Sequence, residues 1–303
     1  MLSLVCPTIK RSACGRMKIK GKHTAFLPLM FGLFLSLTSG KTFAQQANFF
    51  SQSEFGISIG QMYYIGDLNP YMPFNHNQWA GSLMYRYNLH SRMALRINYT
   101  QGSVKAFDYQ SNNPILVNRN LDFHSKIKEI AGGVEFYYAP FYFGRKNGRK
   151  QMQGTAYLLG QIGMFYMNPC TTINGEEVEL RPLGTEGQGT PLNAKGTYSN
   201  FQLCIPLGAG IKAQVGKNVT FSMELAIRKT FTDYLDDVKS ANYVDASILS
   251  ATNGELSGEL SNRSLDNARH GYRGNPTTKD WYVYAGGMVS VRMGRGRKCF
   301  KLR

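Results

Sequence analysis

The sequence predicts an all-β protein: an eight-stranded antiparallel up-and-down outer-membrane β-barrel with long extracellular loops. After residue 44 no apolar run approaches the roughly 20 residues that a membrane helix needs, although the chain holds 18 Tyr, 18 Phe and 32 Gly. Eight segments alternate apolar and polar residues in steps of two, as strands with one apolar face do. Short and long connections also alternate, which is typical of barrels with short periplasmic turns and long external loops.

Residues 1–44 are predicted to be a secretory signal peptide. A basic head precedes the uncharged apolar run 25–37, and Thr42 and Ala44 supply the small residues of a cleavage site. The run is too short to span a membrane as a helix. Met17 is a possible true start. We therefore expect an exported protein.

Eight strands are predicted, and the alternation is clearest from Phe221 to Arg228. The strands cover residues 53–64, 79–88, 92–102, 127–138, 155–167, 199–213, 218–228 and 281–292 of a barrel domain at 45–292. Long loops are predicted at 65–78, 103–126, 168–198 and 229–280. A soluble β-sandwich also alternates, but it has no reason to segregate short and long connections.

The polar face of these strands should line the barrel interior. An eight-stranded barrel is only wide enough for its own side chains. Because an unpaired charge there is costly, we expect acids and bases to cross-pair and to leave no pore. The predicted members are Glu54, Arg86, Arg96, Glu129, Glu135, Lys212, Glu224 and Arg228.

The stretch TFTDYLDDV at 230–238 brings three carboxylates together at the start of the longest loop. Its apolar residues recur at i, i+4 and i+7, which predicts a short amphipathic helical turn packed on the barrel mouth. The spacing D-x-x-D-D does not fit the alternate-position pattern of a calcium loop. We expect Asp233, Asp236 and Asp237 to be architectural or docking residues, with a metal site as the alternative.

Charge and cysteine content limit the function classes. The seven basic residues of the signal leave 28 of the 35 Lys and Arg against 19 acids, a net charge of +9. An exported chain has little access to nucleic acid, so this bias indicates acidic lipid headgroups or an acidic partner.

Cys170, Cys204 and Cys299 are an odd number at wide spacing, which predicts isolated thiols; a Cys170–Cys204 disulfide is the alternative.

No pattern in the sequence predicts catalysis, a cofactor or a metal ion. His124 and Ser125 are adjacent, so on a strand they would point to opposite faces. Nothing in the spacing of Asp233, Asp237 and His270 enforces their proximity. We expect a non-catalytic protein.

The C-terminal tail at 293–303 is basic. An even number of strands returns the chain to the periplasm, where a flexible basic tail suits an acidic partner. Its candidate docking residues are Arg295, Arg297, Lys298 and Lys301.

Five stretches have distinctive amino-acid sequences and follow one another in a distinctive order. They are YYIGDLNP (63–70), YRYNLHSRMALR (85–96), RNLDFHSKIKEIAGGVEF (119–136), TEGQG (185–189) and RKTFTDYLDDV (228–238). They resemble one family, the PorG-like outer-membrane barrels of the type IX secretion system and their relatives. The resemblance implies a non-catalytic component of a secretion- and motility-associated complex that docks periplasmic ring proteins. The alternative is a surface barrel that binds a ligand, polysaccharide or cation through its long loops.

Overall fold

The computed structural model describes residues 52–70, 72–142, 153–191, 193 and 196–293 of the chain. The predicted signal peptide lies outside these residues. So do the four candidate docking residues of the tail, Arg295, Arg297, Lys298 and Lys301.

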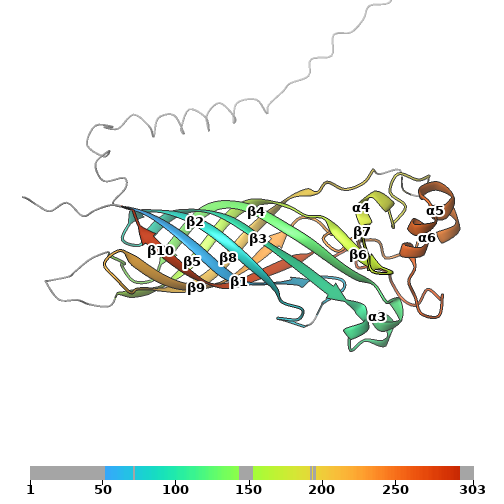
Figure 1. The fold of residues 1–303 in the computed structure, drawn as a ribbon, viewed down its shortest axis with the longest axis horizontal. Coiled ribbons are helices and arrows are strands. Elements are labelled where there is room, and N and C mark those ends of the chain that lie inside the picture. Colours follow the sequence, from blue (N-terminus) through green and yellow to red (C-terminus); the bar gives the residue numbers. More distant parts are fainter. Residues whose placement is uncertain (1–51, 71, 143–152, 192, 194–195, 294–303) are drawn as a thin grey trace, which may run out of the picture. The chain divides into compact units, whose positions relative to one another are not determined.

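Eight long antiparallel strands close into a barrel (Figure 1). The strands are β1 (Ser53–Ile65), β2 (Gln78–His90), β3 (Met93–Phe107), β4 (Asp122–Tyr137), β5 (Gly154–Tyr166), β8 (Phe201–Gln214), β9 (Val219–Thr230) and β10 (Trp281–Arg292). Their order is β3-β2-β1-β10-β9-β8-β5-β4, and pairing of β3 with β4 completes the circle. The predicted fold class is confirmed.

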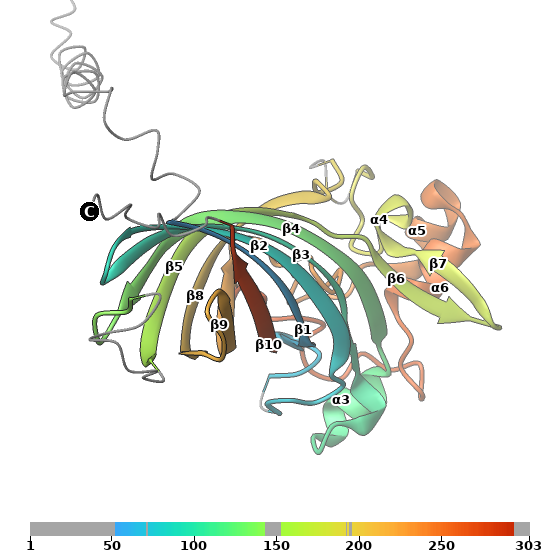
Figure 2. The same cartoon turned by 60° about the vertical axis from the view of Figure 1, so that its left-hand side comes forward.

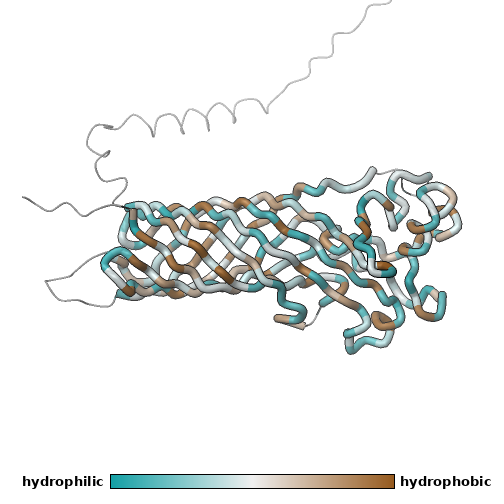
Figure 3. Tube along the Cα trace, viewed as in Figure 1, coloured by the Kyte–Doolittle hydropathy of each residue, from teal (hydrophilic) through white to brown (hydrophobic). Residues whose placement is uncertain are grey.

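The outer wall of the barrel is apolar. In β9 the alternate residues Phe221, Met223, Leu225 and Ile227 are 41–54% exposed, whereas the residues between them are buried. Figure 3 shows hydrophobic residues recurring along the wall. So large an exposed apolar surface is unfavourable in water but suits contact with acyl chains. It is the surface of a barrel that spans a bacterial outer membrane.

The two ends of the barrel differ. At the short-turn end, β2 joins β3 directly after His90, and residues 215–218 join β8 to β9. At the long-loop end the connections are 66–77, 108–121, 167–200 and 231–280. Long loops face the outside of the cell in barrels of this kind, so we call this end extracellular.

Both ends of the predicted loop 103–126 are strand, which is a correction: β3 continues to Phe107 and β4 begins at Asp122. The pairing of β3 with β4 runs unbroken to Phe107 and Asp122. In these added strand residues the apolar side chains face inward: Val104 and Phe123 are buried, while most of the outward side chains are polar. The strands therefore continue above the bilayer with their apolar side chains pointing inward. The sequence prediction assumed that apolar residues face lipid, so it did not detect this part of the strands.

The loops contain further elements. They are η1 (Asp108–Gln110), α3 (Pro114–Arg119), β6 (Pro169–Ile173), β7 (Glu176–Glu179), α4 (Leu180–Leu183), α5 (Ala246–Asn253) and α6 (Glu255–Ser261). The β6–β7 hairpin extends the sheet from β4, and α5 and α6 lie close to α4 (Figure 2). Among the described residues, no helix is both long and apolar enough to cross a membrane. Cys170 and Cys204 are both free thiols.

A hydrophobic core closes the extracellular mouth. It combines side chains from the upper strands with side chains from the loops. Its members include Leu68, Val104, Phe123, Phe165, Leu180, Leu235, Val238, Leu260 and Tyr282. Close packing of this kind leaves little room for solvent, so the mouth is plugged by the protein's own loops.

Candidate functional site

A continuous chain of ion pairs fills the barrel interior. Arg86 donates to Glu54 Oε2 (2.9 Å) and to Glu135 Oε1 (2.8 Å). Arg96 donates to the same Glu135 oxygen at 2.8 Å and also pairs with Glu224. All five side chains are buried. The network therefore links β1, β2, β3, β4 and β9 across the lumen, with each carboxylate facing a guanidinium.

A second ion pair lies in the barrel interior. Arg228 Nε is 3.2 Å from Glu129 Oε2, and the Tyr282 hydroxyl donates to that oxygen at 2.6 Å. Seven of the eight charged residues predicted to face inward thus lie in one of these two groups.

Lys212 is the exception, and the prediction that it pairs with an acid is wrong. Although buried, it forms no ion pair with a described residue. Its Nζ instead lies 3.8 Å from the ring centroid of Tyr137 and 4.2 Å from that of Phe141. A cation over aromatic faces is attracted electrostatically and more strongly when desolvated. Phe141 follows β4 in a turn, so strand alternation could not reveal this partner.

Glu54 also joins the first strand to the last. Its Oε2 accepts a hydrogen bond from Ser290 Oγ at 3.0 Å. In the register of β1 with β10, Glu54 lies opposite Arg292. This carboxylate therefore belongs to both the ion-pair chain and the seam that closes the barrel.

The extracellular mouth carries a second polar assembly, which we call the cap. It consists of residues 66–69, 184–190, 231–240 and 273–280, together with the side chains that they contact. Four of the five family-like stretches contribute to it: 63–70, 119–136, 185–189 and 228–238. Residues that are far apart in sequence thus meet at one place.

Two buried aspartates of the cap meet at one tyrosine. The Tyr64 hydroxyl lies 2.6 Å from Asp236 Oδ2 and 2.7 Å from Asp280 Oδ1. Gly66 permits this approach, because a Cβ there would lie 2.0 Å from the hydroxyl oxygen. Burial, and then repulsion from Asp280, raises the pKa of Asp236 well above its usual range. Burial likewise raises the pKa of Asp280. Because the Tyr64 hydroxyl has one hydrogen, it can donate to only one of the two carboxyl groups at a time, and a protonated carboxyl group can donate to its oxygen.

Glu186 binds three donors in the cap. One oxygen accepts from the backbone N–H groups of Lys239 and Ser240, both at 2.8 Å, and from Arg273 Nη1 at 2.6 Å. Arg273 is buried and also donates to Thr185 Oγ1 at 3.2 Å. The TEGQG stretch thereby holds the segment after 238 in place.

Asp237 is bound by two hydroxyl groups. Thr185 Oγ1 donates to it at 2.5 Å and Tyr198 at 2.7 Å. Burial raises the pKa of Asp237 to about 6, and the opposing charge of Arg273 limits the shift. Its φ of 64° lies in the left-handed region, which packing around it must stabilise.

A bidentate ion pair ties the cap to the hairpin of β3 and β4. Arg119 donates to both oxygens of Asp108, at 2.6 and 2.7 Å. It also donates to the backbone oxygens of Asp67 (3.1 Å) and Arg273. One buried guanidinium therefore links three loops, the fork geometry that arginine favours.

The predicted helical turn at 230–238 is not formed. Residues 231–238 make successive bends, with Phe231 54% exposed and Leu235 and Val238 buried. Partners from other loops override the local helical pattern. The three aspartates are buried as well: Asp233, Asp236 and Asp237 are 3, 2 and 1% exposed, and Asp233 pairs with Lys279 at 3.0 Å. Their burial favours the architectural interpretation over surface docking.

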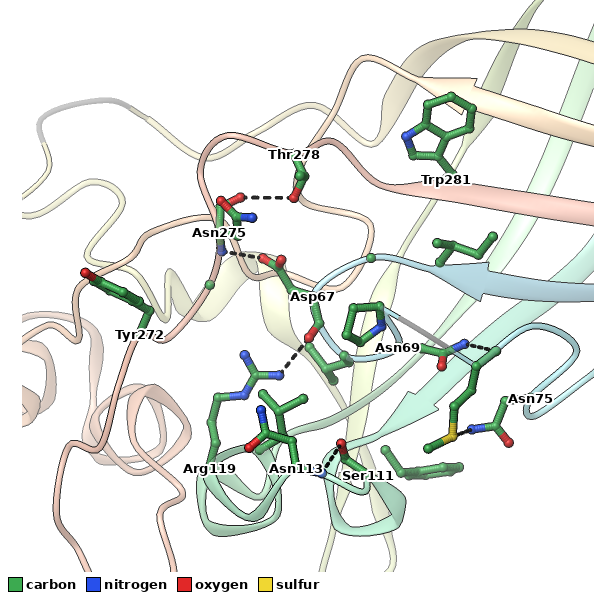
Figure 4. Close-up of a pocket in the computed structure, with 18 of the residues that line it drawn as sticks. Asp67, Asn69, Asn75, Ser111, Asn113, Arg119, Tyr272, Asn275, Thr278 and Trp281 are labelled. Atoms are coloured by element: carbon green, nitrogen blue, oxygen red, sulfur yellow. Dashed lines mark hydrogen bonds between the residues drawn. The ribbon is translucent and has the colours of Figure 1, made fainter.

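A groove of about 1130 Å³ opens beside the cap (Figure 4). It lies among the loops that follow β1, follow β3 and precede β10. Asp67 lies between Asn275, whose N–H it accepts at 2.9 Å, and Arg119. Side-chain amides and aromatic rings line the groove: Asn69, Asn75, Gln110, Asn112, Asn113, Asn275, Phe107, Tyr272 and Trp281. Such a surface offers many hydrogen bonds and flat apolar faces but little net charge.

Residues 30–182 match a family described as a domain of unknown function, DUF6089. The chain belongs to the DUF6089 family. The match does not name the type IX secretion barrels, so that resemblance stays a prediction. No curated protein matches this DUF6089 protein.

Several solved barrels are similar to this DUF6089 protein. Neisserial surface protein A is 8% identical, over 80% of this chain and 97% of that one, with a TM-score of 0.39. Ail of Yersinia pestis, in complex with the heparin analogue sucrose octasulfate, is 13% identical over 78% and 97%, with a TM-score of 0.35. The N-terminal β-barrel domain of Pseudomonas aeruginosa OprF is 10% identical over 79% and 98%, with a TM-score of 0.32. The fold assignment of this protein rests on its own closed strand register.

Several cap residues of this DUF6089 protein gave no signal in the sequence. Arg273 and Asp280 lie in a region without a recognisable pattern, and their partners come from distant loops. Tyr64 and Arg119 lie in two of the family-like stretches, but the sequence did not indicate a function for either residue. His270 pairs with Asp266 on the surface at 2.7 Å and is not brought to Asp233 or Asp237.

Proposed function

We propose that this DUF6089 protein is a non-catalytic, non-conducting outer-membrane component of a protein secretion complex of the type IX, motility-associated kind. The observation that carries the proposal is the double closure of the barrel. Ion pairs fill its interior, and a packed cap plugs its mouth. A barrel closed in this way works through its surfaces and not through a channel. The family-like stretches that meet in the cap support the secretion assignment.

The periplasmic partner is proposed to be a ring protein of that complex with an acidic docking surface. The basic tail residues Arg295, Arg297, Lys298 and Lys301 suit such a surface through long-range attraction. Outer-membrane lipid surrounds the apolar wall.

A strain that lacks the protein tests the secretion role. We expect proteins that are normally exported by the complex to stay inside the cell. Unchanged secretion together with a normal outer membrane would refute the proposal.

The docking role has its own experiment. Replacing the four basic tail residues by Gln should leave the barrel inserted but reduce co-purification of the ring protein at low salt. As salt rises, screening should lower capture by the wild type toward that of the variant. The matched control replaces Lys128 and Arg269, which are exposed basic residues elsewhere. Equal capture by the tail variant and the control would exclude docking through the tail.

The groove favours a second candidate function, binding of a surface polysaccharide or other neutral polar ligand. Amides donate and accept hydrogen bonds with hydroxyl groups, and aromatic faces pack against the apolar faces of sugar rings. The chain has two Trp, and Trp281 lines the groove while Trp79 is 74% exposed on the outer wall.

A single-tryptophan variant, Trp79→Phe, tests this second function. Titration with purified cell-surface polysaccharide should change the fluorescence of Trp281, and Asn113→Ala should weaken the effect. No response at any saccharide concentration, with secretion lost in the deletion strain, would leave only the first candidate.

A further inference from the structure

Three metal-ligating side chains meet on the extracellular hairpin. His124 of β4, Cys170 of β6 and Glu177 of β7 offer one ligand atom each, and these atoms all lie within 4.8 Å of one another. The strand register explains the meeting. Cys170 pairs with His124 on one side and with Glu179 on the other, and Glu177 is two positions from Glu179. Residues two apart in a strand share a face.

We propose that His124, Cys170 and Glu177 form a zinc-binding site. A thiolate, an imidazole and a carboxylate are the three ligand types that Zn²⁺ takes in proteins, and a water can complete the tetrahedron. Sequence spacing could not show this site, because its ligands come from three strands and form no C-x-x-C or H-x₃-H pattern.

The geometry needs only a small adjustment. Tetrahedral bonds of the usual zinc lengths hold ligand atoms about 3.5 Å apart, so the outermost ligand must move by about 1 Å. His124 and Glu177 have side chains 30% and 50% exposed and can adapt, while Cys170 is almost completely buried and fixes the position. His124 Nε2 is already 3.3 Å from Glu177 Oε1.

The surroundings favour a cation. The hairpin strand β7 has the sequence EEVE, which places Glu176, Glu177 and Glu179 within four residues. The Asn168 amide lies 3.7 Å from Cys170 Sγ and donates to Glu179 at 2.9 Å. An outer partner of this kind orients a ligand.

Lys126 is the competitor for the site. Its Nζ lies 3.3 Å from Glu177 Oε1, so a purely ionic cluster of His124, Lys126 and Glu177 is the alternative. Lys126 is 70% exposed and can turn into solvent. An exposed ion pair contributes little stability, whereas a zinc bond to a buried thiolate is strong.

A bound ion would connect the hairpin to the cap. The ligands tie β6 and the edge strand β7 to β4, and β7 leads directly into α4 and then to Thr185 and Glu186. Zinc binding should therefore stabilise the cap segment that holds Asp237.

Cobalt titration of the folded barrel in detergent, prepared without the predicted signal peptide and hence without Cys6 and Cys14, tests the proposal. The background variant is Cys299→Ser, which leaves Cys170 and Cys204 as the two thiols. We expect one Co²⁺ per chain with a thiolate charge-transfer absorption, and displacement of that absorption by Zn²⁺. Cys170→Ser should abolish the absorption. Cys204→Ser, which removes the other buried thiol, should retain it.

Carboxylate variants separate the metal site from a nonspecific acidic surface. Glu177→Gln should weaken Zn²⁺ binding at least tenfold, while the matched variant Glu179→Gln should change it less than threefold. Heat-modifiability on a gel checks that each variant is folded. The proposal is overturned if the folded Cys299→Ser protein shows no thiolate absorption with Co²⁺, or if Cys170→Ser keeps it.

Discussion

The barrel interior and the cap bury charge in different ways. In the interior, Glu135 lies between two guanidiniums, with Arg86 and Arg96 both at 2.8 Å. In the cap, Asp236 and Asp280 share a tyrosine hydroxyl, and neither forms an ion pair with a described residue. The strands direct acids and bases from several registers into one narrow lumen, where they meet; Glu54 and Arg86 are direct cross-strand partners, whereas Arg86 lies opposite Arg96 on its other side. The cap also contains ion pairs, such as that of Glu186 with Arg273. It differs from the interior in holding three buried aspartates by hydroxyl and backbone N–H groups without an ion pair to a described residue: Asp236, Asp237 and Asp280.

The largest expected effect is loss of the carboxylate at the centre of the interior chain. Glu135→Gln keeps the size of the side chain but removes the carboxylate that Arg86 and Arg96 share, so that each guanidinium keeps one acidic partner instead of two. Breaking a buried ion pair costs about 3–5 kcal/mol. We expect a loss of that size in urea unfolding of the barrel in lipid or detergent. The exposed Glu255→Gln serves as control, and equal stability of the two variants would contradict the paired network.

The pH dependence of the cap should be the next largest effect. The pKa of Asp237 is about 6 in the folded protein, against about 3.9 in an unfolded chain. The folded state therefore binds more protons between these values, and its stability falls as pH rises through 6. A shift of two pKa units corresponds to about 3 kcal/mol at most.

Proteolysis within 231–240 at different pH values measures this effect. Cleavage should be slowest near pH 4 and should quicken up to about pH 7, after correction for the protease's own profile. Asp237→Asn, which cannot titrate, should make the profile shallower; part of the slope should remain, because burial also raises the pKa of Asp67 in the cap to about 6. A wild-type profile as flat as that of the variant would exclude Asp237 as its source.

A smaller effect is expected for Asp236→Asn. This is the same acid-to-amide change as Glu135→Gln, but at a carboxyl group whose pKa is already raised by burial. Because an amide resembles a protonated carboxyl group in shape and polarity, we expect a loss below about 1 kcal/mol, the size of one neutral hydrogen bond. A loss as large as that of Glu135→Gln would show that Asp236 is charged and paired.

The smallest expected signal is conductance. With the interior filled by side chains and the mouth plugged, the protein in a planar bilayer should give no stable open channel. Asp236→Asn should not change this. Stepwise conductance at low voltage would show that the interior network does not close the barrel.

Period-two alternation was sufficient to predict the barrel, its eight strands and the inward face. It worked because one side of every strand meets lipid, as Phe221 to Ile227 show. It did not identify the extension of β3 and β4, where the apolar face turns inward at Val104 and Phe123. It also did not predict that Lys212 contacts aromatic rings, one of which, Phe141, belongs to no strand.

The cap could not be predicted from local patterns. TFTDYLDDV has helical spacing, but its aspartates are held by Tyr64, Thr185 and Lys279, from three distant segments. The resemblance to the PorG-like family marked most of the segments that form the cap, but it did not show which residues contact one another. Arg273 and the zinc ligands needed the three-dimensional register.

The position of Glu54 at the seam has a consequence for how the barrel forms. It binds Arg86 from the adjacent hairpin strand and Ser290 from a strand 236 residues further along the chain. Local hairpins can assemble quickly, but contacts of such long sequence separation form slowly. We expect closure of β1 onto β10 to be the late, rate-limiting event of assembly. Until then the carboxylate of Glu54 can bind Arg86 but not Ser290, and the polar face of the open sheet is exposed to water.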